Sequence, residues 1–114
     1  MSSYDAAQLM CTALMDAGID LATVDPRSVN PPCVLFAPPS IRYDTMGSPT
    51  GEWRLYALSP ATGNADAWLL LEDMAAIISA TLDVERADYV AYSLTPDQPP
   101  LPAYRFTFTQ GIEL

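Results

Sequence analysis

One stretch, residues 64–82 (NADAWLLLEDMAAIISATL), constrains the fold of this chain most strongly, because it is the longest helical signal in the sequence. Either Asn64 or Asp66 can cap its first turn, since both side chains accept a hydrogen bond from an unpaired backbone amide. Apolar residues recur at spacings of three and four, which places them on one helical face: Trp68, Leu71, Ala75, Ile78 and Leu82. We therefore predict a long central helix.

This predicted helix carries more apolar surface than one packing face needs. A second apolar stripe lies beside the first and consists of Leu70, Met74 and Ile77. The clearly polar edge consists of Glu72, Asp73 and Ser79. A helix this apolar is covered on more than one side. We expect one side to lie on a sheet of the same chain and the other to meet a second helix or another subunit, which favours assembly over catalysis.

Length and composition are those of one folded domain, residues 1–114. A chain of 114 residues buries roughly two-thirds of its unfolded surface, so a core can form without metal or disulfide staples. The composition is 50% hydrophobic and 17% charged, which argues against disorder. The N-terminus shows no basic segment followed by an apolar one, and no apolar run approaches a membrane span. We expect a soluble protein made in the cytoplasm.

The charged residues exclude several kinds of chemistry. Fourteen acids oppose five bases, which gives a net charge of −9, and the sequence contains neither Lys nor His. The five bases are Arg27, Arg42, Arg54, Arg86 and Arg105. The chain therefore has no Ser–His or Cys–His pair, no imidazole metal ligand and no P-loop lysine. The negative charge also repels a phosphate backbone, so we do not expect the protein to wrap nucleic acid.

Residues 4–17 predict an amphipathic helix at the N-terminus. Its apolar stripe consists of Ala6, Leu9, Met10, Ala13, Leu14 and Ala17. Gly18 ends this helix, because glycine accepts a left-handed conformation, and Ile19 can then fold back on Leu14 in a Schellman-type close. A connector with three prolines, residues 21–32, leads to the strands.

Three short segments in the first half predict strands. Residues 33–37 are apolar like a buried strand, and a Pro-Pro pair then interrupts them. Residues 41–44 and 52–58 predict a hairpin, in which pairing Asp44 opposite Arg54 avoids like charges across the strands. Alternation places on one face Ile41, Tyr43, Trp53, Leu55 and Ala57. The opposite face receives Arg42, Asp44, Glu52, Arg54 and Tyr56.

A second hairpin follows the central helix, formed by residues 88–94 and 103–109. Its second strand has the clearest period-two alternation in the chain, with the rings of Tyr104, Phe106 and Phe108 on one face. We expect Phe106 to be buried under a helix. The expected same-face neighbours are Val90, Tyr92 and Leu94. The order αββαββ predicts an α+β fold, with an antiparallel sheet of about four strands and both helices packed on one face.

No group of residues predicts catalysis or a bound cofactor. Glu72 and Asp73 are adjacent and diverge on a helix, so they do not share a site. Two acidic clusters lack the glycine and spacing of a calcium loop: Asp83, Glu85 and Asp88, and Asp16, Asp20 and Asp25. A base-stacking role for the aromatic strand would need more basic charge than Arg105 supplies. We predict no catalytic residues, no metal and no cofactor.

Cys11 and Cys33 are the only cysteines and form no C-x-x-C motif. A disulfide between them stays open as one interpretation. The other interpretation is that both are small buried hydrophobic residues in a reducing compartment.

The order of elements resembles that of the tail terminator proteins of long-tailed, siphovirus-type bacteriophages, particularly those of actinobacterial hosts. The resemblance is carried by PPCVLFAPPSIRYD (residues 31–44), the hairpin, the long apolar helix and the closing strand PAYRFTFTQ (residues 102–110). It implies a virion protein that forms a homomeric ring, typically of six subunits. The ring caps the tail tube, ends its polymerisation and contacts the head-completion protein. DNA passes through its lumen without specific binding, no membrane is involved, and the family has no catalytic residues.

One segment predicts a contact with the tail tube at the tip of the first hairpin. It consists of Thr45, Met46, Gly47, Ser48, Pro49, Thr50 and Gly51. It contains two glycines, one proline and one large apolar side chain, so it has little to bury within its own subunit. Contacts with partners concentrate at such loop tips on a rigid scaffold.

Three rival functions share parts of this pattern. A head-closure or connector protein would share the size and the ring assembly, but would bind a different place in the particle. A small acidic adaptor or inhibitor would dock a host protein through its apolar helix, as a monomer or dimer. A small enzyme that uses only carboxylates would need two facing acids in a concave pocket, and the sequence gives no support for one.

Overall fold

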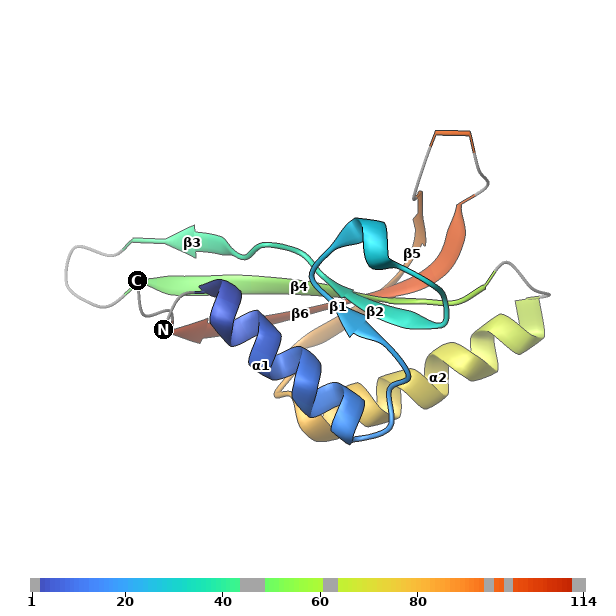
Figure 1. Ribbon diagram of the computed structural model, residues 1–114, viewed down its shortest axis with the longest axis horizontal. Coiled ribbons are helices and arrows are strands. Elements are labelled where there is room, and N and C mark those ends of the chain that lie inside the picture. Colours follow the sequence, from blue (N-terminus) through green and yellow to red (C-terminus); the bar gives the residue numbers. More distant parts are fainter. Residues whose placement is uncertain (1–2, 44–48, 61–63, 94–95, 98–99, 112–114) are drawn as a thin grey trace.

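The computed structural model describes residues 3–43, 49–60, 64–93, 96–97 and 100–111. It is an α+β fold with two long helices and a mixed, six-stranded sheet (Figure 1). In chain order the elements are α1 (Ser3–Asp16), β1 (Ala22–Thr23), the short 3-10 helix η1 (Pro26–Ser28), β2 (Cys33–Phe36), β3 (Ser40–Arg42), β4 (Thr50–Leu58), α2 (Asn64–Thr81), β5 (Arg86–Tyr92) and β6 (Leu101–Gly111).

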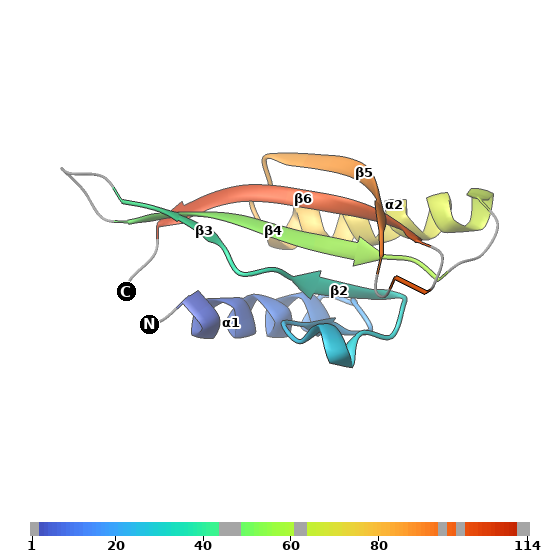
Figure 2. The ribbon, with the colours of Figure 1, turned by 90° about the horizontal axis from the view of Figure 1, so that it is seen from above.

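The sheet is built around the long pair β4 and β6. The strand order is β1-β2-β4-β6-β5, and β3 also pairs with β4. β4 and β6 lie side by side along the molecule (Figure 2), from the pair of Thr50 with Gly111 to the pair of Leu58 with Ala103. β1 runs parallel to β2, and the other pairs are antiparallel. The expected four-stranded antiparallel sheet in the order αββαββ therefore agrees only in outline, since the sheet has six strands and β1 is parallel to β2.

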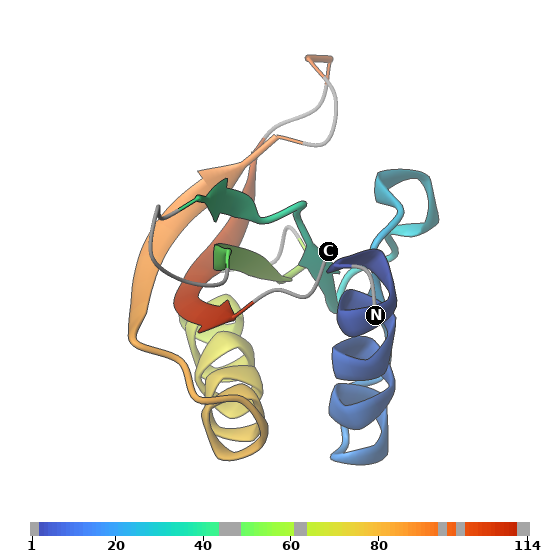
Figure 3. The same ribbon diagram turned by 90° about the vertical axis from the view of Figure 1, so that its left-hand side faces the viewer.

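Both helices lie on the same side of this sheet (Figure 3). One buried cluster joins them to alternate residues of β2, β4 and β6. At its centre Trp53 stacks on Phe108 with the ring centroids 6.2 Å apart, and Leu55 and Phe106 lie beside them across β4 and β6. Phe106 is 2% exposed, so its predicted burial under a helix is confirmed. Trp53, Leu55 and Ala57, which were predicted to share one face, are all buried, whereas Tyr43, assigned to the same face, is 70% exposed.

The end of α1 follows the predicted capping pattern. Gly18 has φ 121°, a conformation that side-chain-bearing residues rarely adopt. The amide of Ile19 donates to the carbonyl of Leu14 at 3.0 Å, and both side chains are buried. The apolar stripe of α1 was predicted correctly only in part, since Leu14 is buried and Ala6 and Met10 pack against the core as predicted. The buried residues of α1 are Ala7, Cys11 and Leu14, whereas Leu9 is 57% exposed.

The central helix is present, and its buried face agrees with the prediction at Leu71 and Ile78 but not at Trp68. The buried row of α2 consists of Ala67, Leu71, Met74 and Ile78. Trp68, predicted on this face, is 62% exposed. With apolar residues on two adjacent stripes, spacing alone did not fix the rotation of the helix about its axis. The smaller side chain, Ala67, takes the inward position beside the sheet.

The register of two strand pairs also differs from the predictions. In the first hairpin Glu52 lies opposite Ser40, and Arg54 lies opposite Thr107 of β6 rather than opposite Asp44, a residue outside the described ranges. In the second hairpin Val90 pairs with Ala103, so Val90 and Tyr92 face away from the helices. The residues of β5 that share the helix face with the aromatic strand are Ala87, Tyr89 and Ala91. The third predicted neighbour, Leu94, lies outside the described ranges.

The two cysteines lie on opposite sides of the sheet. Cys11 belongs to the cluster under the helices, and Cys33 belongs to a smaller cluster on the other side with Leu35, Leu58 and Ala103. Both thiols are free and buried, so the disulfide interpretation is wrong. Burial raises the pKa of the Cys11 thiol to about 11 and also raises the pKa of Cys33.

Candidate functional site

The predicted tube-contact segment falls only partly within the described residues. Thr45, Met46, Gly47 and Ser48 lie outside them, and Pro49 precedes β4. Thr50 and Gly51 are not loop residues, because they are the first two residues of strand β4. Thr50 pairs with Arg42 and Gly111, and Gly51 pairs with Ile41 and Gln110. Gly51 is buried.

An apolar groove lies between the start of α2 and the adjoining strands β5 and β6. Its volume is about 370 Å³, and we call it the aromatic groove. It is lined by Ala67, Trp68, Leu71, Tyr89, Pro102 and Tyr104. Trp68 and Tyr89 are 62% and 64% exposed. Large aromatic side chains that are exposed around one groove are typical of a surface that binds a partner.

Trp68 is held on the outer side of α2 by a hydrogen bond along the helix. Its Nε1 donates to Oε1 of Glu72 at 2.7 Å. Leu69, the next residue, is 62% exposed and adds apolar surface at the same end of α2. The tyrosines of the groove also contact each other, with the rings of Tyr89 and Tyr104 edge-to-face at 5.9 Å. The groove is therefore partly organised before any partner binds.

The outer edge of the sheet beside this groove is β5. It is the last strand in the sheet order, and within the described ranges no strand pairs with its outer side. A seven-residue edge strand presents unpaired backbone donors and acceptors that can join another strand. Its sequence RADYVAY includes charges at Arg86 and Asp88 near one end only. The edge and the aromatic groove form one continuous candidate interface.

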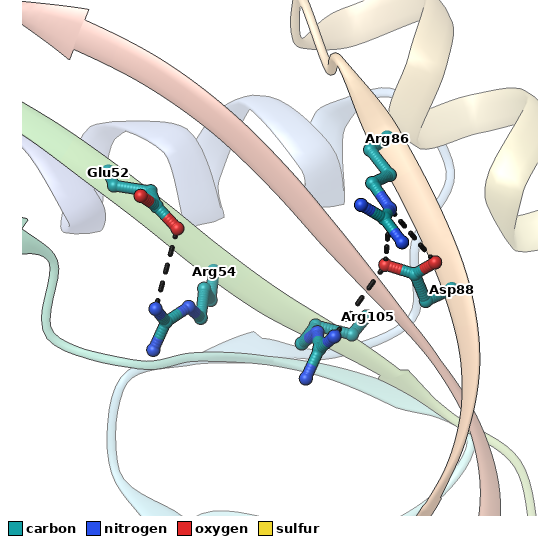
Figure 4. A network of polar contacts seen from close by, with 5 residues as sticks. All are labelled: Glu52, Arg54, Arg86, Asp88 and Arg105. Atoms are coloured by element: carbon teal, nitrogen blue, oxygen red, sulfur yellow. Dashed lines mark hydrogen bonds and ion pairs between the residues drawn. The ribbon is translucent and has the colours of Figure 1, made fainter.

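A second surface lies on the side of the sheet away from the helices (Figure 4). We call it the arginine face and define it by Arg42, Arg54, Arg86 and Arg105 with the carboxylates Glu52 and Asp88. Strand pairing aligns Arg54, Thr107 and Arg86 in one row across β4, β6 and β5. The next row contains Tyr56, Arg105 and Asp88. Arg42 pairs with Thr50, which lies on the same side of β4 as Glu52 and Arg54. Strand pairing therefore brings the four arginines to one face.

Ion pairs partly neutralise this arginine face. Oδ2 of Asp88 lies 2.9 Å from Nε of Arg86 and 3.6 Å from Nη2 of Arg105. Arg54 reaches Oε1 of Glu52 at 3.4 Å. All these side chains retain exposure, so solvent screens the pairs and they contribute little to stability. Four arginines facing two carboxylates leave this face positive in a chain whose net charge is −9.

The outer surface of the two helices has the opposite charge. We call it the acidic helix layer, and its carboxylates are Asp5, Asp16, Asp66, Glu72 and Asp73. All five residues are exposed, and neither helix contains a basic residue. The aromatic groove opens beside this layer through Trp68. Sequence reasoning noted Asp16, Asp66, Glu72 and Asp73 separately and did not consider Asp5. It did not place these acids opposite the arginines, because that placement depends on the sheet.

The described residues bring no metal-binding or membrane-spanning feature together. Within them, no three His, Cys, Asp or Glu side chains form a group that could hold a metal ion. Neither of the described helices combines the length and hydropathy that crossing a bilayer requires. No known protein family matches this sequence, and no curated protein was found to be similar to it.

Proposed function

We propose that this protein is a structural component of a bacteriophage tail. In this account, identical copies, six in the resembling family, form a ring at the head-proximal end of the tail. The ring caps the tail tube, ends its polymerisation and joins it to the head-completion protein. The subunit is made in the host cytoplasm, acts without catalysis or a cofactor, and resides in the virion.

The observation that carries this proposal is the continuous interface of the aromatic groove and the β5 edge. Trp68 and Tyr89 expose aromatic surface there, and β5 offers seven residues of strand for pairing. A lone soluble subunit gains nothing from such a surface, whereas a subunit of an assembly covers it. We therefore propose self-association through this edge and the outer side of α2.

The charge of the subunit supports a ring around DNA. A net charge of −9 removes the attraction that causes non-specific binding to a phosphate backbone. DNA can then slide through the lumen during packaging and ejection. The same charge opposes association at long range, so a stable ring needs complementary contacts at short range.

The aromatic groove also fits an alternative function, that of a small acidic adaptor or inhibitor that docks a host protein through α2. Such a protein would bind as a monomer or dimer and would form no ring. A head-closure or connector protein would share the ring assembly, but it would bind a different place in the particle from a tail terminator.

We keep the tube-contact proposal for Thr45, Met46, Gly47, Ser48 and Pro49, and exclude Thr50 and Gly51 because they belong to β4. The comparison to make is amide exchange of Thr45, Met46, Gly47 and Ser48 in the free subunit and in assembled tails, because proline has no amide hydrogen. Slower exchange in tails supports a contact with the tube. Equal exchange in both states would remove this segment from the account.

The test of the function is the purified protein, examined by light scattering and negative-stain imaging with and without purified tail tubes. A ring is expected in solution or, when closure needs the tube end, on the tubes alone. The adaptor function predicts monomers or dimers under both conditions and no density at tube ends.

A further inference from the structure

We propose that the arginine face of one subunit docks on the acidic helix layer of the next copy, so that the ring repeats a single front-to-back contact. This inference rests on the proposed function, because it assumes that the chain assembles with itself. It deepens that function by naming the two surfaces that meet.

The two surfaces lie on opposite sides of one sheet. Residues alternate along β4, so that Trp53 and Leu55 pack under the helices while Arg54 points to the other side. Arg86 on β5 shares the side of Arg54, because both pair with Thr107. A subunit therefore carries the arginines in front and the helices behind, as Figures 3 and 4 together show.

Charge determines which surfaces can meet. Two arginine faces brought together would place like charges opposite each other, and so would two acidic helix layers. Juxtaposed like charges cost several kcal/mol in an interface, whereas opposite charges steer and align the partners. Association by contact of one face with the same face is therefore disfavoured, and the arginine face is expected to contact the acidic helix layer.

The side chains suit this contact. Arg54 and Arg86 are 46% and 72% exposed, so their guanidinium groups can exchange an exposed carboxylate of their own strand for one of the neighbour. Arginine forms planar, two-pronged bonds with carboxylates, which favours it over lysine at such interfaces. On the outer side of α2, Glu72 and Asp73 lie between the large exposed side chains of Trp68 and Leu69 and the small exposed side chains of Ala76 and Ala80. The short side chains let long arginines approach this end of the helix.

Symmetry connects this contact to a ring. A contact between two different surfaces of the same subunit repeats from copy to copy, and it closes into a ring when the rotation per copy permits. A contact between identical surfaces stops at a dimer.

Two charge-reversed variants test the contact. The sheet variant Arg54→Glu/Arg86→Glu makes the front acidic. The helix variant Glu72→Arg/Asp73→Arg makes the outer side of α2 basic, since two arginines then accompany one carboxylate, Asp66, on that helix. Each variant alone would place like charges together, so self-association should weaken by roughly tenfold or more. Mixed in equal amounts, the two variants pair a basic surface with an acidic one at each contact. The mixture should recover assembly to within about threefold of the unaltered protein.

Assembly is measured by sedimentation velocity of the protein alone and by co-pelleting with purified tail tubes. Circular dichroism and melting temperature check that each variant folds, and Arg54→Gln/Arg86→Gln replaces the sheet variant if it does not. Arg27→Glu is the charge control, because Arg27 lies on η1 outside the arginine face and is 92% exposed. This variant and the single variant Arg86→Glu change the net charge equally, but only the latter should weaken assembly.

The outcomes separate this inference from the proposed function. If the unaltered protein forms rings and both variants do so equally well, the front-to-back contact is wrong while the ring stands. Loss in each variant without recovery in the mixture would also overturn it, because the loss would then not come from paired charges. If the unaltered protein assembles neither alone nor on tubes, the proposed function fails and this inference fails with it.

Discussion

The indole of Trp68 donates a 2.7 Å hydrogen bond to the carboxylate of Glu72, one turn further along α2. This bond keeps a large aromatic side chain on the outside of a helix whose inner side is occupied by Ala67 and Leu71. It also joins the aromatic groove to the acidic helix layer, since Trp68 belongs to the first and Glu72 to the second. The two residues thus connect the apolar and the charged parts of one candidate interface.

Replacing Trp68 with Ala should impair assembly while leaving the fold intact. Trp68 is 62% exposed, so its truncation should change the free energy of unfolding by less than about 1 kcal/mol. Exposed aromatic residues at interfaces often contribute about 2 kcal/mol or more to binding. Urea unfolding and sedimentation velocity measure the two effects. Trp68→Phe is the matched control and should keep most assembly, because it retains an aromatic ring; a large loss of stability in Trp68→Ala would place the residue in the core.

Replacing Phe106 with Ala should destabilise the fold by roughly 3–5 kcal/mol, from lost burial and the cavity left behind. Phe106 is 2% exposed and lies between Leu55 and Ala87 on the helix side of the sheet. Thr107→Ala, the adjacent position on the other side, should cost less than about 1 kcal/mol. Urea unfolding of both variants makes the comparison. Costs that are equal, or reversed, would contradict the assignment of the two faces.

Replacing Gly18 with Ala should cost about 1 kcal/mol or more, because a side chain strains the backbone at φ 121°. A Cβ at this position would lie 3.6 Å from Cδ1 of Ile77, an ordinary contact, so backbone strain accounts for the effect. Thermal and urea unfolding of the variant measure it. An unchanged or higher stability would mean that the chain leaves α1 by a different turn.

The thiol of Cys11 should make stability fall in alkaline solution. Burial raises its pKa from 9.0 to about 11, so the folded protein keeps the proton over an interval in which the unfolded chain releases it. The stabilising contribution is present below pH 9 and is lost as the pH rises towards about 11, at about 1.4 kcal/mol per pH unit. Urea unfolding between pH 8 and about 10.5 should show a steeper decline in the unaltered protein than in Cys11→Ala. Parallel declines would show that this thiol is not desolvated.

Local sequence patterns correctly predicted those parts of the fold that are decided by residues close together in the chain. The end of α1 at Gly18 and the alternation around Phe106 are fixed within a few positions of the chain, and both were predicted correctly. The buried face of α2 was predicted only in part. Leu71 and Ile78 are buried as predicted, but two apolar stripes compete, and only contact with the sheet selects Ala67 over Trp68. The faces of Val90 and Tyr92 were misassigned because pairing register, rather than their own spacing, decides them.

The arginine face could not be predicted from local patterns. Arg54 and Arg86 lie 32 positions apart in the sequence, and they share a row only because each pairs with Thr107. The aromatic groove likewise joins the start of α2 to β5 and β6. A signal for it did exist, since the surplus of apolar residues on α2 indicated a second covered side.

The central claim is that identical copies of this chain form a ring at the end of the tail, and the most direct measurement is a cryo-electron microscopy structure of the intact particle. The account predicts a closed ring of this chain between the tail tube and the head-completion protein. Each copy should place its aromatic groove and β5 edge against a neighbouring copy. A single copy among unlike neighbours, or no copy in the particle, would contradict it.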